Sequence, residues 1–120
     1  MQDPKRVMVY QTSNGSKPFE DWLTLLKDKK AQASIRVRIN RLRAGLLGDV
    51  KPVGQSIHEL RVDIGKGYRV YFGNHDATLV VLLCGSDKKS QDKDIKQAKR
   101  YWDDYKSRTK SESTESSDRI

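Results

Sequence analysis

The sequence has little cysteine and histidine and no long apolar run, and each shortage excludes a class of protein. One cysteine, Cys84, and two histidines, His58 and His75, are too few for a zinc site, which needs several such ligands. Cys84 has no partner for an internal disulfide and lies in an apolar run, which favours a small buried side chain over a nucleophile. No apolar run approaches the roughly 20 residues of a membrane-spanning helix. We therefore expect a cytoplasmic protein that uses no metal and no cofactor and does not enter a membrane.

Motifs for nucleotide binding and for covalent catalysis are also missing. The sequence contains neither a phosphate-loop nor a dinucleotide glycine pattern, and it lacks a Gly-x-Ser-x-Gly nucleophile motif. The segment Gly65-Lys66-Gly67 lies between two short apolar-alternating segments, so it predicts a hairpin turn. Catalysis by a serine or cysteine nucleophile is not supported.

Positive charge is what the chain has in excess. Its 120 residues, enough for one domain, carry 24 Lys and Arg against 16 Asp and Glu, a net charge of +8. Small basic domains bind polyanions by releasing their counterions, and RNA is the polyanion that we expect. The segment 107–120 is rich in Ser and has no apolar residue before Ile120, which predicts a disordered polar tail behind a domain of residues 1–106.

The apolar pattern predicts the element order β-α-α-β-β-β-α. A helix with Pro18 in its first turn is followed by a second with an apolar stripe at Ile35, Ile39, Leu42 and Leu46, which ends near Leu46 or Leu47 with Gly48 as its cap. Residues 51–56 form a loop. The remaining expected elements are strands at residues 7–11, 57–64, 68–72 and 79–84 and a last helix at residues 91–105.

The second helix has six basic residues and no acidic one between positions 29 and 43. They are Lys29, Lys30, Arg36, Arg38, Arg41 and Arg43. One interpretation is a solvated basic face, and the other is a surface that contacts phosphates or an acidic protein segment.

Two arginines on neighbouring strands predict a more specific site. Alternation places Arg61 and Arg69 on the face opposite the apolar residues, and the turn at Lys66 brings them across from one another. Two guanidinium groups on a rigid sheet form a preorganised phosphate clamp. Glu59 shares their face, so a plain Glu59–Arg69 surface ion pair is the simpler alternative. The loop after the next strand can lie over the same face, and it carries Asp87, Lys88, Lys89 and Gln91.

Such a cationic group suits metal-free RNA cleavage. The ribose 2′-oxygen attacks the adjacent phosphate while a base takes its proton, cations stabilise the phosphoryl oxygens, and an acid protonates the leaving 5′-oxygen. His58 has a suitable residue type for the base, but alternation places it with Leu60 on the apolar face, which favours a structural role. The proton-transfer groups stay unassigned.

In combination these motifs resemble a known family. Glu59-Leu60-Arg61, Tyr68-Arg69-Val70-Tyr71-Phe72, Asp87-Lys88-Lys89 and Asp94-Ile95-x-x-Ala98 resemble the RelE/HigB-type toxins of bacterial type II toxin–antitoxin modules, in the phage-related branch of addiction-module killer proteins. The resemblance covers about residues 5 to 106. It implies a RelE/ParE-like α+β fold, with two N-terminal helices packed on a mainly antiparallel four-stranded sheet and a C-terminal helix.

The resemblance also implies an activity and partners. Such toxins are ribosome-dependent endoribonucleases that cut mRNA in the ribosomal A site, and a cognate helix-turn-helix antitoxin neutralises the toxin and binds the operator DNA. Arg69 matches the phosphate-stabilising arginine, Arg61 and Lys88 or Lys89 match its partners, and Glu59 orients Arg61 or accepts a proton. Lys66, Gln91 and the basic helix would contact mRNA and 16S rRNA.

Several relatives in that family carry a functional Tyr or His near the last strand, and the segment Gly85-Ser86-Asp87-Lys88-Lys89 has neither, whereas Tyr101 and Tyr105 lie on the last predicted helix and are expected to be packing residues. Two other functions stay open. A ParE-like gyrase inhibitor shares the expected sheet but needs no catalytic cation cluster, and a non-catalytic basic module would bind RNA or a partner with a steep salt dependence and no cleavage.

Overall fold

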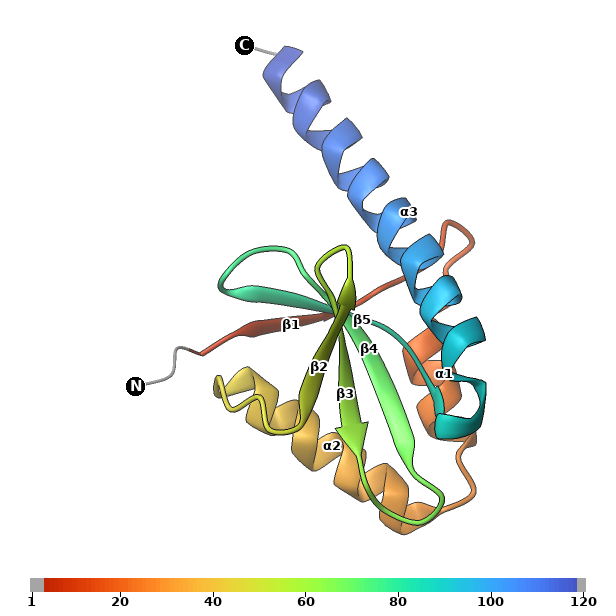
Figure 1. The fold of residues 1–120 in the computed structure, drawn as a ribbon. Coiled ribbons are helices and arrows are strands. Elements are labelled where there is room, and N and C mark those ends of the chain that lie inside the picture. The colour runs from red at the N-terminus through yellow and green to blue at the C-terminus, as the bar shows by residue number, and fades with distance from the viewer. Residues whose placement is uncertain (1–3, 119–120) are drawn as a thin grey trace.

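A single mixed β-sheet forms the centre of the molecule and carries helices on both faces (Figure 1). The structure is a computed structural model that describes the backbone of residues 4–118 and the side chains of residues 4–109. The sheet has five strands in the order β1-β5-β4-β3-β2, of which β1 is parallel to β5 and the other neighbours are antiparallel. The strands are β1 (Arg6–Val9), β2 (Val50–Gly54), β3 (Ile57–Val62), β4 (Tyr68–Asn74) and β5 (Leu79–Asp87).

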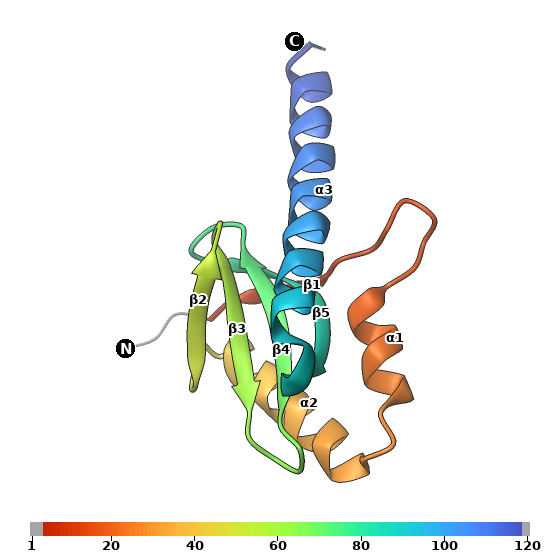
Figure 2. The ribbon, with the colours of Figure 1, turned by 45° about the vertical axis from the view of Figure 1, so that its right-hand side comes forward.

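The helices divide between the two faces of this sheet. Helices α1 (Pro18–Leu25) and α2 (Lys29–Arg43) pack on one face, and α3 (Gln91–Asp118) packs on the other after a short 3₁₀ turn, η1 (Lys88–Ser90). Figure 2 shows α3 continuing far beyond the sheet. The apolar alternation of β3 and β4 decides this arrangement, because each face of the two strands meets a different helix layer.

Each helix layer brings one tryptophan close to the sheet at a glycine. Trp102 of α3 lies over Gly73 of β4, and Trp22 of α1 lies over Gly85 of β5. A Cβ atom at either glycine would overlap the indole ring. The two glycines therefore let the helices approach the strands closely, as strand glycines often do.

The expected architecture, two N-terminal helices on a mainly antiparallel four-stranded sheet, is wrong. The sheet has five strands and is mixed, and the long C-terminal helix covers its second face. The extra strand is β2, in a segment expected to be a loop. Pro52 is tolerated there because β2 is an edge strand, and Gln55 and Ser56, both with positive φ (57° and 66°), close a tight turn into β3.

The second helix is also shorter than its apolar stripe predicts. It begins where the Asp28 side chain accepts a hydrogen bond from the Ala31 N–H at 3.0 Å, and it ends at Arg43. Gly45 stops it with a φ of 85°, and the Leu46 N–H bonds back to the Arg41 carbonyl at 2.8 Å. Leu46 is consequently 48% exposed, so its place in the buried stripe and the cap at Gly48 were wrong predictions.

At the C-terminal end the regular elements extend past their predicted limits. Strand β5 reaches Asp87, and α3 continues to Asp118, through the residues 107–118 for which the composition predicts a disordered tail. Residues 119–120 lie outside the described residues, and the division of the chain at residue 106 stays a prediction. Within residues 4–118, no helix is long and apolar enough to cross a membrane.

Candidate functional site

Strands β3 and β4 place the predicted cations side by side. Arg61 is the register partner of Arg69, and Glu59 is the register partner of Tyr71, so all four side chains project from one face of the sheet. The predicted juxtaposition of Arg61 and Arg69 is therefore confirmed. Two like charges directly opposite each other destabilise a strand pair unless a counter-charge lies between them.

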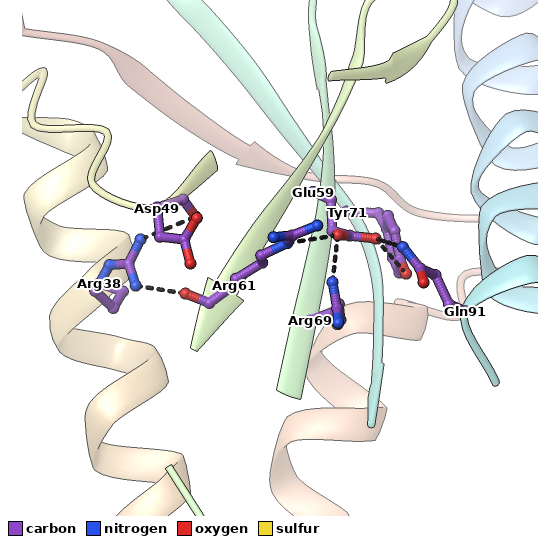
Figure 3. Close-up of polar contacts among 7 residues, drawn as sticks. All are labelled: Arg38, Asp49, Glu59, Arg61, Arg69, Tyr71 and Gln91. Carbon is purple, nitrogen blue, oxygen red and sulfur yellow. Dashed lines mark hydrogen bonds and ion pairs between the residues drawn. The ribbon is translucent and has the colours of Figure 1, made fainter. Parts of the chain in front are cut away.

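Glu59 supplies that counter-charge and is fully buried. One carboxylate oxygen, Oε1, accepts from Arg61 Nε at 3.0 Å and from Nη1 of Arg69 (Figure 3). The other, Oε2, accepts from the Tyr71 hydroxyl at 3.1 Å and from Gln91 Nε2 at 2.9 Å. A carboxylate has about four acceptor positions, so these four donors occupy all of them. We call this group, made of Glu59, Arg61, Arg69, Tyr71 and Gln91, the Glu59 cluster.

The cluster keeps Glu59 ionised. Burial opposes the charged form, but the hydrogen bonds from Arg61 and Gln91 and the charge of Arg69 outweigh it, so the pKa of Glu59 lies below its usual range. Burial and the neighbouring Glu59 charge raise the pKa of the Tyr71 hydroxyl, which therefore keeps its proton. An ionised carboxylate with every acceptor position filled holds the arginines in place and has no position free to take a proton.

A shallow hollow of about 220 Å³ opens beside the two arginines, and we call it the arginine hollow. The side chain of Arg61 is 35% exposed and that of Arg69 is 16% exposed, so both reach solvent while they bind Glu59. The residues that line it are Asp49, Arg61, Val62, Asp63, Gly67, Tyr68, Arg69 and Lys88. Three cations thus meet at one opening, with Asp49 and Asp63 as its carboxylates.

Lys88 reaches this hollow because Gly67 leaves space for its stem. Gly67 has a φ of +85°, and a Cβ atom there would lie 3.2 Å from Lys88 Cδ. The Lys88 N–H also donates to the Gly67 carbonyl at 3.3 Å. The sequence left Lys88 and Lys89 as equivalent choices, and the structure places Lys88 in the lining of the hollow.

Three other predicted site residues have different contacts. Lys66 Nζ lies 3.4 Å from an Asp87 carboxylate oxygen, and the Lys89 N–H donates to Asp87 Oδ1 at 3.0 Å. Gln91 was predicted to contact RNA, but its amide supports Glu59 from the first turn of α3. The lining of the arginine hollow does not include Lys66, Lys89 or Gln91.

Among the predicted cations of α2, Arg38 has a clear structural task. Its guanidinium donates to the backbone carbonyls of Arg61, Leu47 and Asp49, the last two at 3.2 and 3.4 Å, and so ties α2 to the sheet (Figure 3). Burial lowers the pKa of Arg38. The exposed basic residues of α2 are Lys29, Lys30, Arg36, Arg41 and Arg43.

Neither histidine belongs to the site. His58 stacks on Phe72, with ring centroids 5.5 Å apart, and its Nδ1 lies 3.0 Å from Asn74 Nδ2. Burial lowers the pKa of His58, which is consistent with a neutral packing residue. His75 meets the Tyr105 ring edge-on at 5.7 Å. In the part of the chain with described side chains, no three His, Cys, Asp or Glu residues are grouped as metal ligands.

Comparison with known proteins gives one clear relationship. No family model matches the chain. It is 57% identical over 81 residues to an uncharacterized protein of Haemophilus influenzae, an alignment that covers 68% of this chain and 82% of that protein. The chain belongs to the same family as the Haemophilus protein.

Sequence reasoning missed four residues of the site. Alternation along residues 68–72 puts Tyr71 on the same face as Arg69, and this is the available signal for its contact with Glu59. Asp49 and Asp63 line the arginine hollow from outside the strands, where no periodic pattern marks a side chain, and alternation assigns Tyr68 to the apolar face with Val70 and Phe72. These residues line the hollow only because the ends of β2, β3 and β4 lie next to one another in the fold.

Proposed function

We propose that this protein is the toxin component of a toxin–antitoxin system and a ribosome-dependent, metal-independent mRNA endoribonuclease. The observation that carries the proposal is the Glu59 cluster, in which one buried carboxylate fixes two arginines beside an open hollow that Lys88 also lines. A preorganised set of cations suits the charge that gathers on a phosphoryl group during cleavage. The motifs that resemble RelE/HigB-type toxins are consistent with this use of the site, although the four-stranded sheet that they imply is not present.

In this mechanism one RNA phosphate occupies the arginine hollow. Arg61 and Arg69 stabilise its oxygens as the ribose 2′-oxygen attacks and the 5′-oxygen leaves. Lys88 binds the same phosphate or protonates the leaving oxygen. Glu59 acts as a positioning residue, because its acceptor positions are filled. Asp49 and Asp63 are the carboxylates of the hollow and hence its candidate proton acceptors.

The same proposal assigns roles to the remaining surface and to partners. The exposed cations of α2, with Lys66 and Lys89, contact mRNA and 16S rRNA on the ribosome. A helix-turn-helix antitoxin neutralises the protein in the cytoplasm and carries the complex to operator DNA.

The buried ion pairs support a second candidate function. Arg61 and Arg69 both bind Glu59, and such a network also stabilises a module that binds RNA without cutting it. That module would show binding with a steep salt dependence and no cleavage when ribosomes are present.

The test is expression in bacteria with mapping of mRNA 5′ ends. We expect growth arrest and new 5′ ends within translated codons, and we expect Arg69→Ala to abolish both, because one charge-stabilising donor contributes about 10²–10³ in rate. Arg100→Ala is the control, since Arg100 is an exposed cation of α3 that bonds Gln97 at 3.3 Å. An Arg69→Ala protein that stays fully toxic contradicts the assignment, and arrest with intact mRNA and a DNA-damage response indicates gyrase inhibition instead.

A further inference from the structure

A second hollow lies beside α2 and shares lining residues with the arginine hollow. This second hollow measures about 410 Å³, and Val62 and Asp63 line both. Its other lining residues are Ala33, Ser34, Val37, Arg38, Arg41 and Ile64. We call it the helix hollow. The two openings lie on either side of the end of β3, so one extended ligand can occupy both.

The end of β3 is accessible because β2 stops short of it. The register of β2 and β3 ends at the pair Val50 and Leu60, so residues 62–64 have no strand neighbour on that side. Arg38 fixes the distance between α2 and β3 through its bond to the Arg61 carbonyl (Figure 3). Arg38 therefore holds α2 against the part of β3 that lies between the two hollows.

The chemistry of the helix hollow differs from that of the arginine hollow. Val37 is 47% exposed, and Ile64 lies beside it half-buried, which gives the hollow an apolar patch. Arg41 is exposed, and within residues 4–109 its side chain enters no hydrogen bond or ion pair. Asp63 is the acidic group between the two hollows. An apolar patch next to a free guanidinium suits an unstacked base and its phosphate.

We propose that a single-stranded RNA segment crosses the end of β3, with one phosphate in the arginine hollow and the adjacent nucleotide in the helix hollow. Arg41 binds the phosphate of that nucleotide, and Val37 and Ile64 contact its base. This inference rests on the proposed function, since it extends the same substrate. It gives one residue of the basic helix a direct place on the substrate, next to the reacting phosphate.

The test measures the affinity of 2′-O-methyl oligoribonucleotides for the purified protein by fluorescence anisotropy. These probes lack the attacking hydroxyl, so cleavage does not affect the result. A dinucleotide has one phosphodiester and fits the arginine hollow, whereas a hexanucleotide also reaches the helix hollow. We expect the hexanucleotide to bind more tightly than the dinucleotide.

Two substitutions separate the charge and the apolar patch. Arg41→Gln should weaken hexanucleotide binding and reduce its salt slope by about 0.7, the value for one phosphate contact on a single strand. Val37→Ser should weaken it by about fourfold with an unchanged slope, because it removes apolar contact and no charge. Neither should alter dinucleotide binding, and Arg100→Gln should alter neither probe.

Equal effects of Arg41→Gln and Arg100→Gln on the hexanucleotide would overturn the inference, as would equal losses for the two probes. These outcomes are separate from the proposed function. If cleavage needs Arg69 but Arg41→Gln has no effect on binding, the proposed nuclease activity is supported and the second subsite in the helix hollow is contradicted. Length-dependent binding that needs Arg41, without any mRNA cleavage, would support the RNA path across the end of β3 and contradict the proposed nuclease activity.

Discussion

Replacement of Glu59 by glutamine tests the central feature of the site. The substitution removes one negative charge and puts an NH₂ group where a carboxylate oxygen stood. If that group takes the place of Oε1, it faces Arg61 and Arg69, and if it takes the place of Oε2, it faces the Tyr71 hydroxyl and Gln91. The first orientation sets donors against donors and loses two of the four bonds. In the second, the Tyr71 hydroxyl and a turned Gln91 amide can accept from the NH₂ group, and the loss is the negative charge that faces the two arginines.

The magnitude follows from burial. A buried polar group left without a partner costs about 1–3 kcal/mol. The arginine side chains are 35% and 16% exposed and can turn to water, which limits their share of the cost. Tyr71 is fully buried, but its hydroxyl can accept as well as donate, so the main loss is the charge that strengthens the two arginine bonds, about 1 kcal/mol for each. We expect Glu59→Gln to lower the free energy of unfolding by about 2 kcal/mol, which for a urea m-value of about 2 kcal/mol/M shifts the midpoint down by about 1 M.

The assay is urea unfolding at pH 7, with mRNA cleavage measured on the same preparations. Glu20→Gln is the matched control, because Glu20 lies exposed on α1, 3.9 Å from Lys17, in a surface pair worth less than about 1 kcal/mol. Cleavage should fall even under conditions where Glu59→Gln is fully folded, because the arginines lose their common anchor. A midpoint equal to that of the Glu20→Gln protein would refute the role given to Glu59.

Three further predictions concern the Glu59 cluster and the residues that surround the arginine hollow. The folded-state pKa of Glu59 lies below its ordinary 4.5, so the unfolded chain binds more protons than the folded protein in acid. The stabilisation from Glu59 is therefore complete above about pH 5 and is lost as the pH falls through the folded-state pKa. Urea midpoints measured from neutral to acidic pH should show this loss in the wild type and not in Glu59→Gln. Gly67→Ala should cost about 1–2 kcal/mol by thermal unfolding because of its positive φ, and should reduce cleavage because the new Cβ displaces Lys88. Arg38→Met should lower stability by about 1–3 kcal/mol in urea, because carbonyls that Arg38 satisfies lose their donor, whereas a purely RNA-binding Arg38 would leave the midpoint unchanged.

Local alternation was sufficient to predict the centre of the site. Apolar residues at every second position from Leu60 to Val62 and from Tyr68 to Phe72 mark one face, so the opposite face of Glu59, Arg61 and Arg69 could be read from the sequence, and the short turn between the strands fixed their register. The depth of Glu59 could not be read in this way. It depends on Gln91 and the first turn of α3, which arrive from 32 residues away in the chain.

The edges of the sheet could not be predicted because their residues have no pattern of their own. Strand β2 exposes Lys51 and Pro52 and has no apolar alternation, so it forms only because β3 offers a partner. The four residues of β1 indicate a strand but not its direction, and the parallel pairing with β5 arises from where α1 and α2 pack. Leu46 continued the helical stripe in sequence, but the positive φ of Gly45 ended the helix first.

The balance of charge at the Glu59 cluster is itself an argument for function. Replacing a buried ion pair by apolar residues of similar size is often neutral or stabilising, so the stability of this sheet does not require Glu59, Arg61 and Arg69. Glu59 is shared by the two arginines, and the hollow also brings Lys88 together with the carboxylates of Asp49 and Asp63. The lower pKa of Glu59 keeps the carboxylate charged at neutral pH, so the arginines stay aligned on it. An arrangement that holds two guanidinium groups in fixed positions and exposes part of each beside Lys88 is suited to bind a phosphate.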